Sequence, residues 1–354
     1  RVKNRSIDVR LSTMPTQFGE SVVMRLLDQS QGLLSLNHIG MSERVLDRFR
    51  ASIHQPQGLV LVTGPTGSGK TTTLYGALSE LNSPEVKIIT VEDPVEYRLP
   101  RINQVQINSR IGLTFASVLR SALRQDPDIL MVGEMRDEET AEIGLRAAMT
   151  GHLVLSTLHT NDAISTALRL LDMGVAGYMV ASSLQAVLSQ RLVRRICPMC
   201  VEDDPLNVRK RNWLLAAMGQ EGLETAFKRG GGCAHCNNTG YRGRVGIFEL
   251  LEMDDTLSDA LRRGASGDFA AAARNKTSFR PLTSNALDYA KEGITSLDEV
   301  IRVSGELEQP LESVEAEPAA ATAEAATEAE EEKATSAREQ PGEEPTPEAR
   351  YLED

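Results

Sequence analysis

A glycine-rich segment, Gly64-Pro-Thr-Gly-Ser-Gly-Lys-Thr71, has the residue types and spacing needed to hold a phosphate group. It follows the apolar run 58–63, which favours a short buried strand, and precedes residues 71–81, which have a helical pattern. Glycines allow backbone N–H groups to converge on phosphate oxygens at a helix N-terminus, where the dipole favours anions. The Lys70 ammonium would reach the β- and γ-phosphates, and the Thr71 hydroxyl would ligate Mg²⁺. The segment therefore predicts a nucleoside triphosphate as the substrate.

A carboxylate ends a second strand-like segment, Ile129-Leu-Met-Val-Gly-Glu134. Beside a phosphate loop, an apolar strand that ends in a carboxylate contacts Mg²⁺ directly or through water. Apolar runs that end in a solvated Glu are common, so the segment alone is weak evidence. Its combination with the phosphate loop favours the functional interpretation of Glu134.

An acidic turn follows a further strand-like segment, at Thr90-Val-Glu-Asp-Pro-Val-Glu-Tyr97. A hydrolase needs a carboxylate that polarises the attacking water. The turn offers three candidates, Glu92, Asp93 and Glu96. An acidic turn that caps a helix explains the pattern equally well.

Two histidines flank the strand-like segment near residues 152–158. A lone histidine in such a place is more often structural than catalytic. His159 lies at the carboxyl end of the segment, where ligands bind in parallel sheets. It is therefore a better candidate than His152 for a contact to the γ-phosphate.

Four cysteines form two C-x-x-C pairs, Cys197-Pro-Met-Cys200 and Cys233-Ala-His-Cys236. This spacing predicts a structural Cys₄ zinc site of the treble-clef or ribbon kind, because a thioredoxin-type redox site needs only one pair. His235 could replace one cysteine, although the four thiolates suffice for tetrahedral coordination.

Charge is distributed unevenly along the 354 residues. Residues 306–354 hold 16 acidic and 3 basic residues, whereas 1–305 hold 34 acidic and 35 basic residues. The nearly neutral body lacks the strongly basic surface expected of a nucleic-acid binder. The acidic segment has almost no large apolar residues, so we expect it to be disordered. No apolar run reaches the ~20 residues that span a bilayer, and the start at Arg1 leads us to expect that a preceding segment is missing.

The spacing of the motifs indicates the elements that position them. Between 58 and 195, strand-like segments alternate with helical patterns, which predicts an α/β fold with a mostly parallel sheet and helices on both faces. Ligands bind at the carboxyl ends of the strands in such sheets. The strands are expected near 58–63, 86–91, 103–107, 128–133 and 152–158, and the helices near 71–82, 114–125, 137–149, 162–173 and 177–193.

Further elements are expected outside this core. Residues 6–12 alternate as a half-buried strand does, 22–27 form a second short strand, and 42–53 form an amphipathic helix. Short helices are expected at 256–263 and 297–303.

Four segments occur together and in order, and they strongly resemble those of the bacterial type II secretion and type IV pilus assembly ATPases. They are the phosphate loop, the acidic turn, Arg124-Gln-Asp-Pro-Asp-Ile-Leu-Met-Val-Gly-Glu-Met-Arg-Asp137, and Thr150-Gly-His-Leu-Val-Leu-Ser-Thr-Leu-His-Thr-Asn161. The tetracysteine region is similar to the metal-binding insert of the assembly branch, which the retraction branch lacks. The resemblance covers roughly residues 1–304. It is greatest to the ATPases of mannose-sensitive haemagglutinin-type pili, with the general secretion ATPases a near second.

The resemblance implies a RecA-like P-loop NTPase core and roles for individual residues. Glu134 would be the Walker B carboxylate, Glu92 the glutamate that positions water, and His159 the contact to the γ-phosphate. The implied nucleotide-binding residues are Gly64, Pro65, Thr66, Gly67, Ser68, Gly69, Lys70, Thr71 and Thr72. Arg10 and Arg25 would complete the site of a neighbouring subunit in a hexamer, where a trans cation stabilises the transferring phosphoryl group. Without the resemblance, two solvated arginines at strand edges are the simpler interpretation.

The resemblance also implies a homo-hexameric motor that uses ATP, Mg²⁺ and Zn²⁺ to drive pilus or pseudopilus assembly. Such a motor is cytoplasmic and peripheral at the inner membrane, where it works with a platform protein and binds no nucleic acid. The family's first N-terminal domain has no counterpart here, nor do the first strands of the second.

Two alternatives remain for the function. A nucleic-acid translocase with a zinc module is disfavoured by the neutral body and few aromatic residues. A nucleotide-switched scaffold without hydrolysis is disfavoured by the set of Lys70, Glu92, Glu134 and His159.

The expected regions follow the chain in order. They are a partial second N-terminal domain of PAS-like α/β fold at 1–38, a linker at 39–57, the P-loop ATPase core at 58–195, the zinc-binding tetracysteine subdomain at 196–245, a C-terminal helical region at 246–305 and the disordered acidic tail at 306–354.

Overall fold

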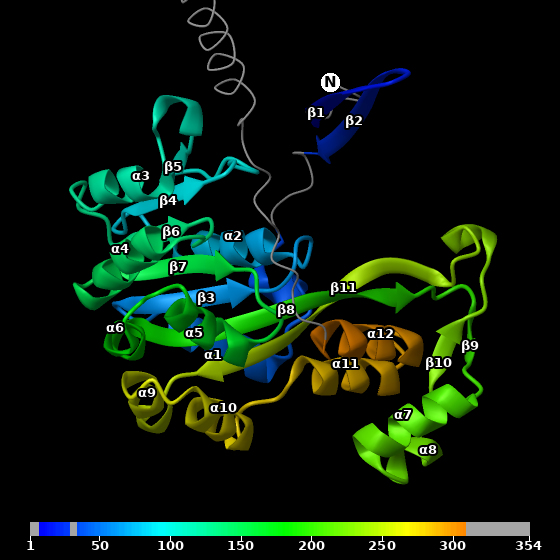
Figure 1. Ribbon diagram of the computed structural model, residues 1–354. Coiled ribbons are helices and arrows are strands. Elements are labelled where there is room, and N and C mark those ends of the chain that lie inside the picture. Colours follow the sequence, from blue (N-terminus) through cyan, green and yellow to red (C-terminus); the bar gives the residue numbers. More distant parts are fainter. Residues whose placement is uncertain (1–6, 29–33, 309–354) are drawn as a thin grey trace, which may run out of the picture. The chain divides into compact units, whose positions relative to one another are not determined.

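The computed structural model describes residues 7–28 and 34–308, and its main feature is a seven-stranded sheet (Figure 1). The strands follow one another across the sheet in the order β11-β8-β3-β7-β6-β4-β5. Their bounds are β3 Gly58–Thr63, β4 Ile88–Glu92, β5 Asn103–Gln106, β6 Ile129–Val132, β7 Leu153–Leu158, β8 Leu184–Ile196 and β11 Tyr241–Glu252. All neighbours run parallel except β11, which is antiparallel to β8. The predicted, mostly parallel sheet is confirmed.

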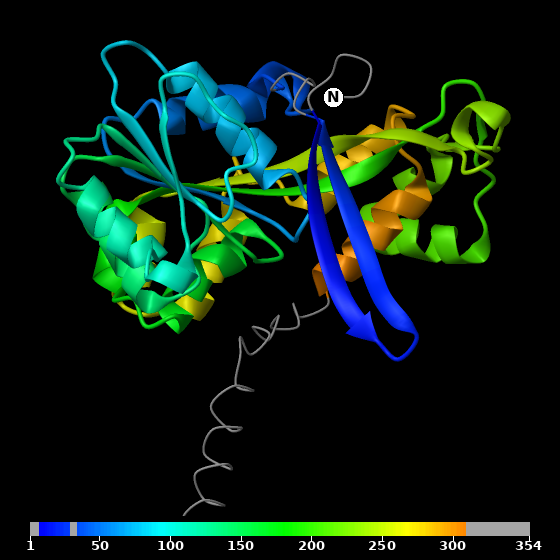
Figure 2. The same cartoon turned by 90° about the horizontal axis from the view of Figure 1, so that it is seen from above.

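Helices cover both faces of this sheet, because its central strands are apolar on both sides. Leu59 and Leu61 of β3 belong to one buried cluster, and the alternate residues Val60 and Val62 belong to another. In Figure 2 the blue helices α1 and α2 lie on one side of the sheet and the teal-to-yellow helices on the other. The first group is α1 Glu43–Ile53 and α2 Lys70–Leu81, and the second is α3 Phe115–Ala122, α4 Glu138–Met149, α5 Ala163–Asp172, α6 Gly177–Ser183, α9 Asp255–Arg262 and α10 Ser266–Asn275.

The helix predicted at 177–193 is wrong for most of its length. Helix α6 ends at Ser183, and the chain continues as β8, which pairs with β3 on one side and β11 on the other. Every residue of β8 from Leu184 to Val193 is buried or half-buried. Because both faces of the strand are covered, it has no exposed face that would require polar residues at every second position. An apolar run of this kind does not distinguish a buried strand from a buried helix by its period alone.

Strands β8 and β11 continue together toward the cysteine region, and β11 crosses the boundary that the sequence predicts at 245. The insert between the cysteine pairs contains the small strands β9 Val201–Asp203 and β10 Lys228–Gly230 and the helices α7 Val208–Met218 and α8 Glu221–Glu224. The last helices, α11 Leu282–Lys291 and α12 Leu297–Glu308, pack with Val193 and Ile247 in a third buried cluster. Helices α9 and α12 confirm the short helices predicted at 256–263 and 297–303.

Two buried carboxylates attach the C-terminal helices to the sheet. Glu299 of α12 accepts hydrogen bonds from Arg194 of β8, with the shortest at 2.7 Å, and from Arg302. Although burial opposes it, these donors hold the pKa of Glu299 at about 2. Glu249 of β11 accepts backbone N–H groups from Ala163 at 2.6 Å and from Leu282 at 2.9 Å. It thereby caps the N-termini of α5 and α11, and full burial raises its pKa to about 7.

The described N-terminal residues form a hairpin of β1 Ile7–Thr16 and β2 Gly19–Asp28, where two strands were expected. Its apolar side chains are largely exposed, with Leu11 at 61% and Met24 at 65%. A short 3₁₀ helix, Leu36–His38, precedes α1. Helix α1 confirms the amphipathic helix predicted at 42–53. The expected disorder of 306–354 concerns residues that lie almost entirely outside the described ones. Within the described ranges, no helix is both long and apolar enough to cross a bilayer.

Candidate functional site

The strand order brings the sequence-predicted groups to one edge of the sheet. Strand β7 lies between β3 and β6, and β6 lies next to β4. These four strands run parallel, so the segments that follow them leave the sheet at the same edge. The phosphate loop follows β3, His159 follows β7 and Glu134 follows β6. The acidic turn begins in the last residues of β4, which ends at Glu92.

The phosphate loop, residues 64–69, has a backbone that requires glycine. Gly64 and Gly69 have φ values of 140° and 94°, which residues with a Cβ rarely adopt. A Cβ on Gly64 would also lie 2.3 Å from the backbone oxygen of Gln190. Helix α2 begins at Lys70, and no side chain caps its N-terminus. Its first backbone N–H groups are therefore available to an anion.

The polar side chains of the loop and of the first turn of α2 also fit a phosphate group. The Nζ of Lys70 folds back and donates to the carbonyl oxygens of Gly64 at 2.8 Å and Pro65 at 3.3 Å. Burial lowers the pKa of Lys70 to about 8, and a bound anion would favour the charged form again. The Oγ of Ser68 is one of the buried polar atoms that lack a partner in the described part of the chain. The Thr71 side chain is exposed and free to reach a cation.

Glu134 and His159, which come from separate strands, lie together. Their Oε2 and Nε2 atoms are 3.6 Å apart, and the other carboxylate oxygen accepts from Arg136 at 2.5 Å. Burial alone would raise the pKa of Glu134, but the His159 ring and the Arg136 guanidinium beside it lower this pKa to about 2. Glu134 is therefore ionised at neutral pH, as a group beside a metal ion must be. The His159 side chain is 46% exposed, so solvent reaches it at this edge of the sheet.

Glu92, the first carboxylate of the acidic turn, is buried and fully engaged. Its Oε2 accepts from the Tyr75 hydroxyl at 2.5 Å, and its Oε1 accepts from Thr90 at 2.5 Å and from Gln104 at 3.1 Å. The residue is only 4% exposed. Burial, with this contact, raises the pKa of Tyr75, so the phenol remains the donor. Glu92 therefore has no free oxygen that faces solvent.

Glu96 and Asp93, the other two carboxylates of the turn, are less enclosed than Glu92. Glu96 is half-buried and Asp93 is exposed. The backbone N–H of Glu96 donates to the Tyr75 hydroxyl at 3.3 Å, so one phenol contacts both glutamates. The turn therefore presents a second glutamate whose side chain is partly exposed and forms an ion pair with Arg10.

Arg10 and Arg25 face each other in the register of the β1–β2 hairpin. Two like charges directly opposite each other repel unless a counter-ion accompanies them. Arg25 is exposed, and a guanidinium nitrogen of Arg10 lies 3.0 Å from a carboxylate oxygen of Glu96. The trans role expected of both arginines concerns a second subunit and stays a prediction.

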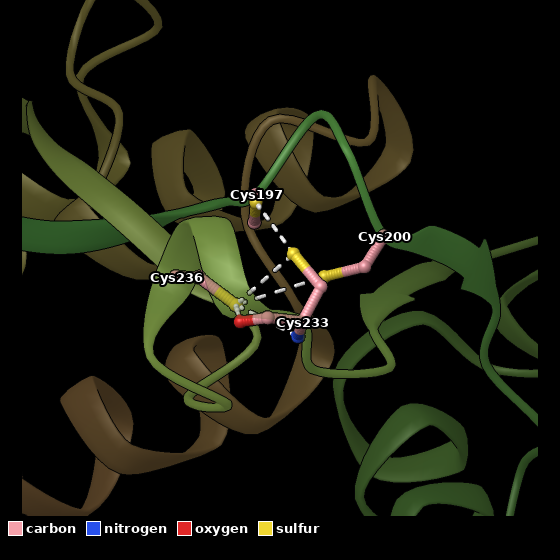
Figure 3. Close-up of side chains that lie close together, drawn as sticks. All are labelled: Cys197, Cys200, Cys233 and Cys236. Atoms are coloured by element: carbon pink, nitrogen blue, oxygen red, sulfur yellow. Dashed lines mark hydrogen bonds between the residues drawn. The ribbon is translucent and has the colours of Figure 1, made fainter.

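The four cysteine sulfurs converge on one point (Figure 3). The pairs Cys233–Cys236, Cys200–Cys236 and Cys197–Cys233 have sulfur separations of 3.7, 3.8 and 3.9 Å. A tetrahedral ion with metal–sulfur bonds of about 2.3 Å requires a separation of roughly 3.8 Å. Burial would raise the pKa of Cys236, but backbone N–H groups of Cys233 and Gly240 help to lower it to about 6. The arrangement therefore fits a metal ion held by four thiolates.

The motifs do not include two residues that contact the phosphate loop or the acidic turn. Tyr75 is hidden in the apolar pattern of α2, although a buried tyrosine needs a partner for its hydroxyl. Gln190 is 2% exposed and contacts the loop from β8. Its signal is the polar trio Ser189-Gln190-Arg191 inside an apolar run, which the mistaken helix prediction obscured.

A family model described as "Type II/IV secretion system protein" matches residues 1–302. The chain therefore belongs to this family, as the resemblance of its motifs predicted. The chain is 49% identical over 306 residues to the type II secretion system ATPase E of Vibrio cholerae serotype O1, with 86% of this chain and 60% of that protein covered. It is 48% identical over 299 residues to the type IV pilus assembly ATPase PilB of Myxococcus xanthus, with 84% and 52% covered. The chain thus spans about three fifths of the first of these relatives and half of the second.

Solved structures support the same fold. The pilus retraction motor PilT with bound ADP matches with a TM-score of 0.60 and 27% identity, over 83% of this chain and 77% of that chain. The ATPase DotB of Legionella pneumophila matches with a TM-score of 0.63 and 22% identity, over 86% and 75%, and shows the fold alone. The curated relatives of this chain are named ATPases, and the solved structure of PilT has a similar fold.

Proposed function

We propose that this chain binds and hydrolyses ATP as part of a hexameric motor that assembles a type IV pilus or a secretion pseudopilus. One observation carries the proposal: four parallel strands deliver the phosphate loop, the Glu134–His159 pair and the acidic turn to a single edge of the sheet. Such an edge is where open α/β sheets bind nucleotides. The names of the relatives, which are secretion and pilus assembly ATPases, support the same assignment.

The roles of the residues follow from their surroundings. The backbone N–H groups of the loop and of the first turn of α2 would hold the β- and γ-phosphates, with Lys70 moving from the loop carbonyls to the phosphates. Thr71 and the ionised Glu134 would hold Mg²⁺, which neutralises charge on the phosphates. His159 is exposed enough to contact the γ-phosphate while its Nε2 stays near Glu134.

Because the carboxylate of Glu92 is enclosed, we propose that Glu96, and not Glu92, polarises the attacking water. A general base must come within hydrogen-bonding reach of the attacking water, and both oxygens of Glu92 already accept from buried donors. Glu96 lies on the same turn, is half-buried and is connected to Glu92 through Tyr75. Its carboxylate pairs with Arg10, so this ion pair has to open before Glu96 can meet the water. We therefore assign water positioning to Glu96, and to Glu92 the positioning of the acidic turn.

The assembly direction and the hexamer rest on two further supports. The chain has the tetracysteine cluster, and it is 48% identical to a protein named as a pilus assembly ATPase but 27% identical to one named as a retraction motor. Arg10 pairs with Glu96 of its own chain, whereas the exposed Arg25 opposite it could meet the triphosphate of a neighbouring subunit. A platform protein at the inner membrane would complete the machine, with the motor on the cytoplasmic side.

The thiolate set favours zinc as the resident metal. Four sulfurs in a tetrahedron bind zinc or iron, and zinc supplies folding energy without an open coordination position. Cys197 directly follows β8, and Cys233 and Cys236 precede β11, so the ion would lock the ends of these paired strands.

Replacement of Lys70 tests the proposed hydrolysis. Lys70→Ala removes the charge that meets the phosphates, so we expect ATP hydrolysis to fall by about 100-fold or more. Phosphate release in steady state measures it, with Lys291→Ala, an exposed lysine in α11, as the matched control. The wild type and the control should hydrolyse ATP equally. Hydrolysis by Lys70→Ala at the wild-type rate would contradict the assignment of the phosphate loop to the nucleotide site.

Replacement of the two glutamates separates their roles. Glu96→Gln should retain ADP binding but lower hydrolysis by about 100-fold. Glu92→Gln should lower it less, because Tyr75 and Thr90 can still hold a neutral amide in the turn. The exposed Glu85→Gln, just before β4, is the control for lost charge. Normal hydrolysis by Glu96→Gln together with none by Glu92→Gln would return the role to Glu92.

Metal analysis tests the cysteine site. Purified protein should contain about one zinc ion per chain, and Cys197→Ser or Cys233→Ser should lose it and unfold at a lower temperature. His235→Ala is the matched control, because the His235 ring contacts Cys197 but His235 does not belong to the cluster of four cysteines. Four reactive thiols in folded protein without metal would contradict the assignment, and zinc loss in His235→Ala would make the histidine a ligand.

A further inference from the structure

Gln190 connects the sheet to the phosphate loop and to helix α2, which follows it. Its Nε2 donates to the backbone oxygen of Ser68 at 2.8 Å, and its Oε1 accepts from the Thr73 hydroxyl at 2.8 Å. The residue lies on β8, which pairs with β3, the strand that leads into the loop. It is almost fully buried, so neither hydrogen bond competes with water.

The bond to Ser68 determines where the next N–H group points. A trans peptide is planar, so its C=O and N–H point in opposite directions. Because the Ser68 carbonyl points toward Gln190, the N–H of Gly69 points away from β8. Gly69 is the residue before α2, and its N–H is one of those that a loop of this kind directs at a phosphate.

This peptide needs an external restraint. Glycine reaches positive and negative φ values with similar ease, so a peptide next to Gly69 can rotate at low cost. The Nε2 of Gln190 would lie 3.1 Å from a Cβ at Gly69, which shows how closely the amide approaches the loop. The Ser68 carbonyl can only accept, so it fixes the NH₂ end of the amide toward the loop. The Thr73 hydroxyl then donates to the amide oxygen and holds the other end.

We propose that Gln190 is a positioning residue that holds the Ser68–Gly69 peptide in its phosphate-binding orientation before the nucleotide arrives. The amide is neutral, so it orients the loop without competing with Lys70 for the phosphates. The inference rests on the proposed function, since it assumes that the loop binds the diphosphate of ADP or ATP. Its consequence is that nucleotide affinity depends on a side chain that never touches the nucleotide.

Substitution of Gln190 in the full chain tests this role. Gln190→Met retains the length of the side chain but loses both hydrogen bonds, so the dissociation constant for ADP with Mg²⁺ should rise by about tenfold. Gln190→Glu can still accept from Thr73 but cannot donate to Ser68, and it brings a negative charge toward the phosphates. Its affinity for ADP should fall further. Calorimetric titration with Mg²⁺ and ADP measures both.

Ser189→Ala is the matched control, because Ser189 is the neighbouring buried residue of β8 and its hydroxyl has no partner in the described structure. It should bind ADP as the wild type does. In a melting experiment, ADP should raise the unfolding temperature of the wild type and of Ser189→Ala more than that of Gln190→Met. A role in stability alone would lower the unfolding temperature without nucleotide and leave the ADP affinity unchanged.

A double substitution tests the route through Thr73. Thr73→Val alone should weaken ADP binding by a smaller factor, and the combination with Gln190→Met should add little to Gln190→Met alone. Folded Gln190→Met that binds ADP with wild-type affinity would overturn the inference while leaving the proposed function intact. If the wild type itself does not bind ADP, the proposed function fails, which is a separate outcome.

Discussion

The parallel alignment of β3, β7, β6 and β4 is the constraint on which the site depends. Each strand is buried on both faces, so a shift by one residue would move every side chain into the packed cluster on the opposite face, where it does not fit. The register of the four strands is therefore fixed, and so are the positions of their carboxyl ends relative to one another. The phosphate loop, His159, Glu134 and the acidic turn are short extensions of these ends, and their mutual distances are set by the sheet.

Strand β8 connects the proposed nucleotide-binding edge of the sheet to the C-terminal helices and the cysteine region. Two of its residues connect different parts of the molecule: Gln190 contacts the phosphate loop, and Arg194 pairs with Glu299 of α12. Cys197 directly follows its last residue. The antiparallel partner β11 contributes Glu249, which caps α5 and α11. A change at the nucleotide loop is thus one strand away from both the C-terminal helices and the cysteine cluster. In the proposed motor, this continuity would allow a change at the nucleotide loop to reach the C-terminal helices and the cysteine cluster.

The sequence predicted those parts of the fold that have a local signal. The five strands from 58 to 158 and the helices between them were expected near their observed places, because glycines, prolines and helix caps mark their ends. The convergence of four cysteines followed from their spacing. Strand β8 was missed because a run that is buried on both faces has no diagnostic period.

The site was predicted less completely than the fold, because its details depend on contacts between distant segments. The pairing of Glu134 with His159 joins residues from two strands, and only the strand order explains it. The sequence offered three carboxylates in the acidic turn, but the enclosure of Glu92 depends on Tyr75 of α2 and Gln104 of β5. Gln190 carries no motif, since its role arises from the strand next to β3.

The central claim is that one edge of the sheet forms a single nucleotide site. Hydrogen–deuterium exchange with and without ADP and Mg²⁺ tests it most directly, because it reports on all segments at once. The account predicts slower exchange in residues 64–73 together with the segments that follow β4, β6 and β7. Protection confined to another part of the chain, or none at saturating ADP, would contradict it.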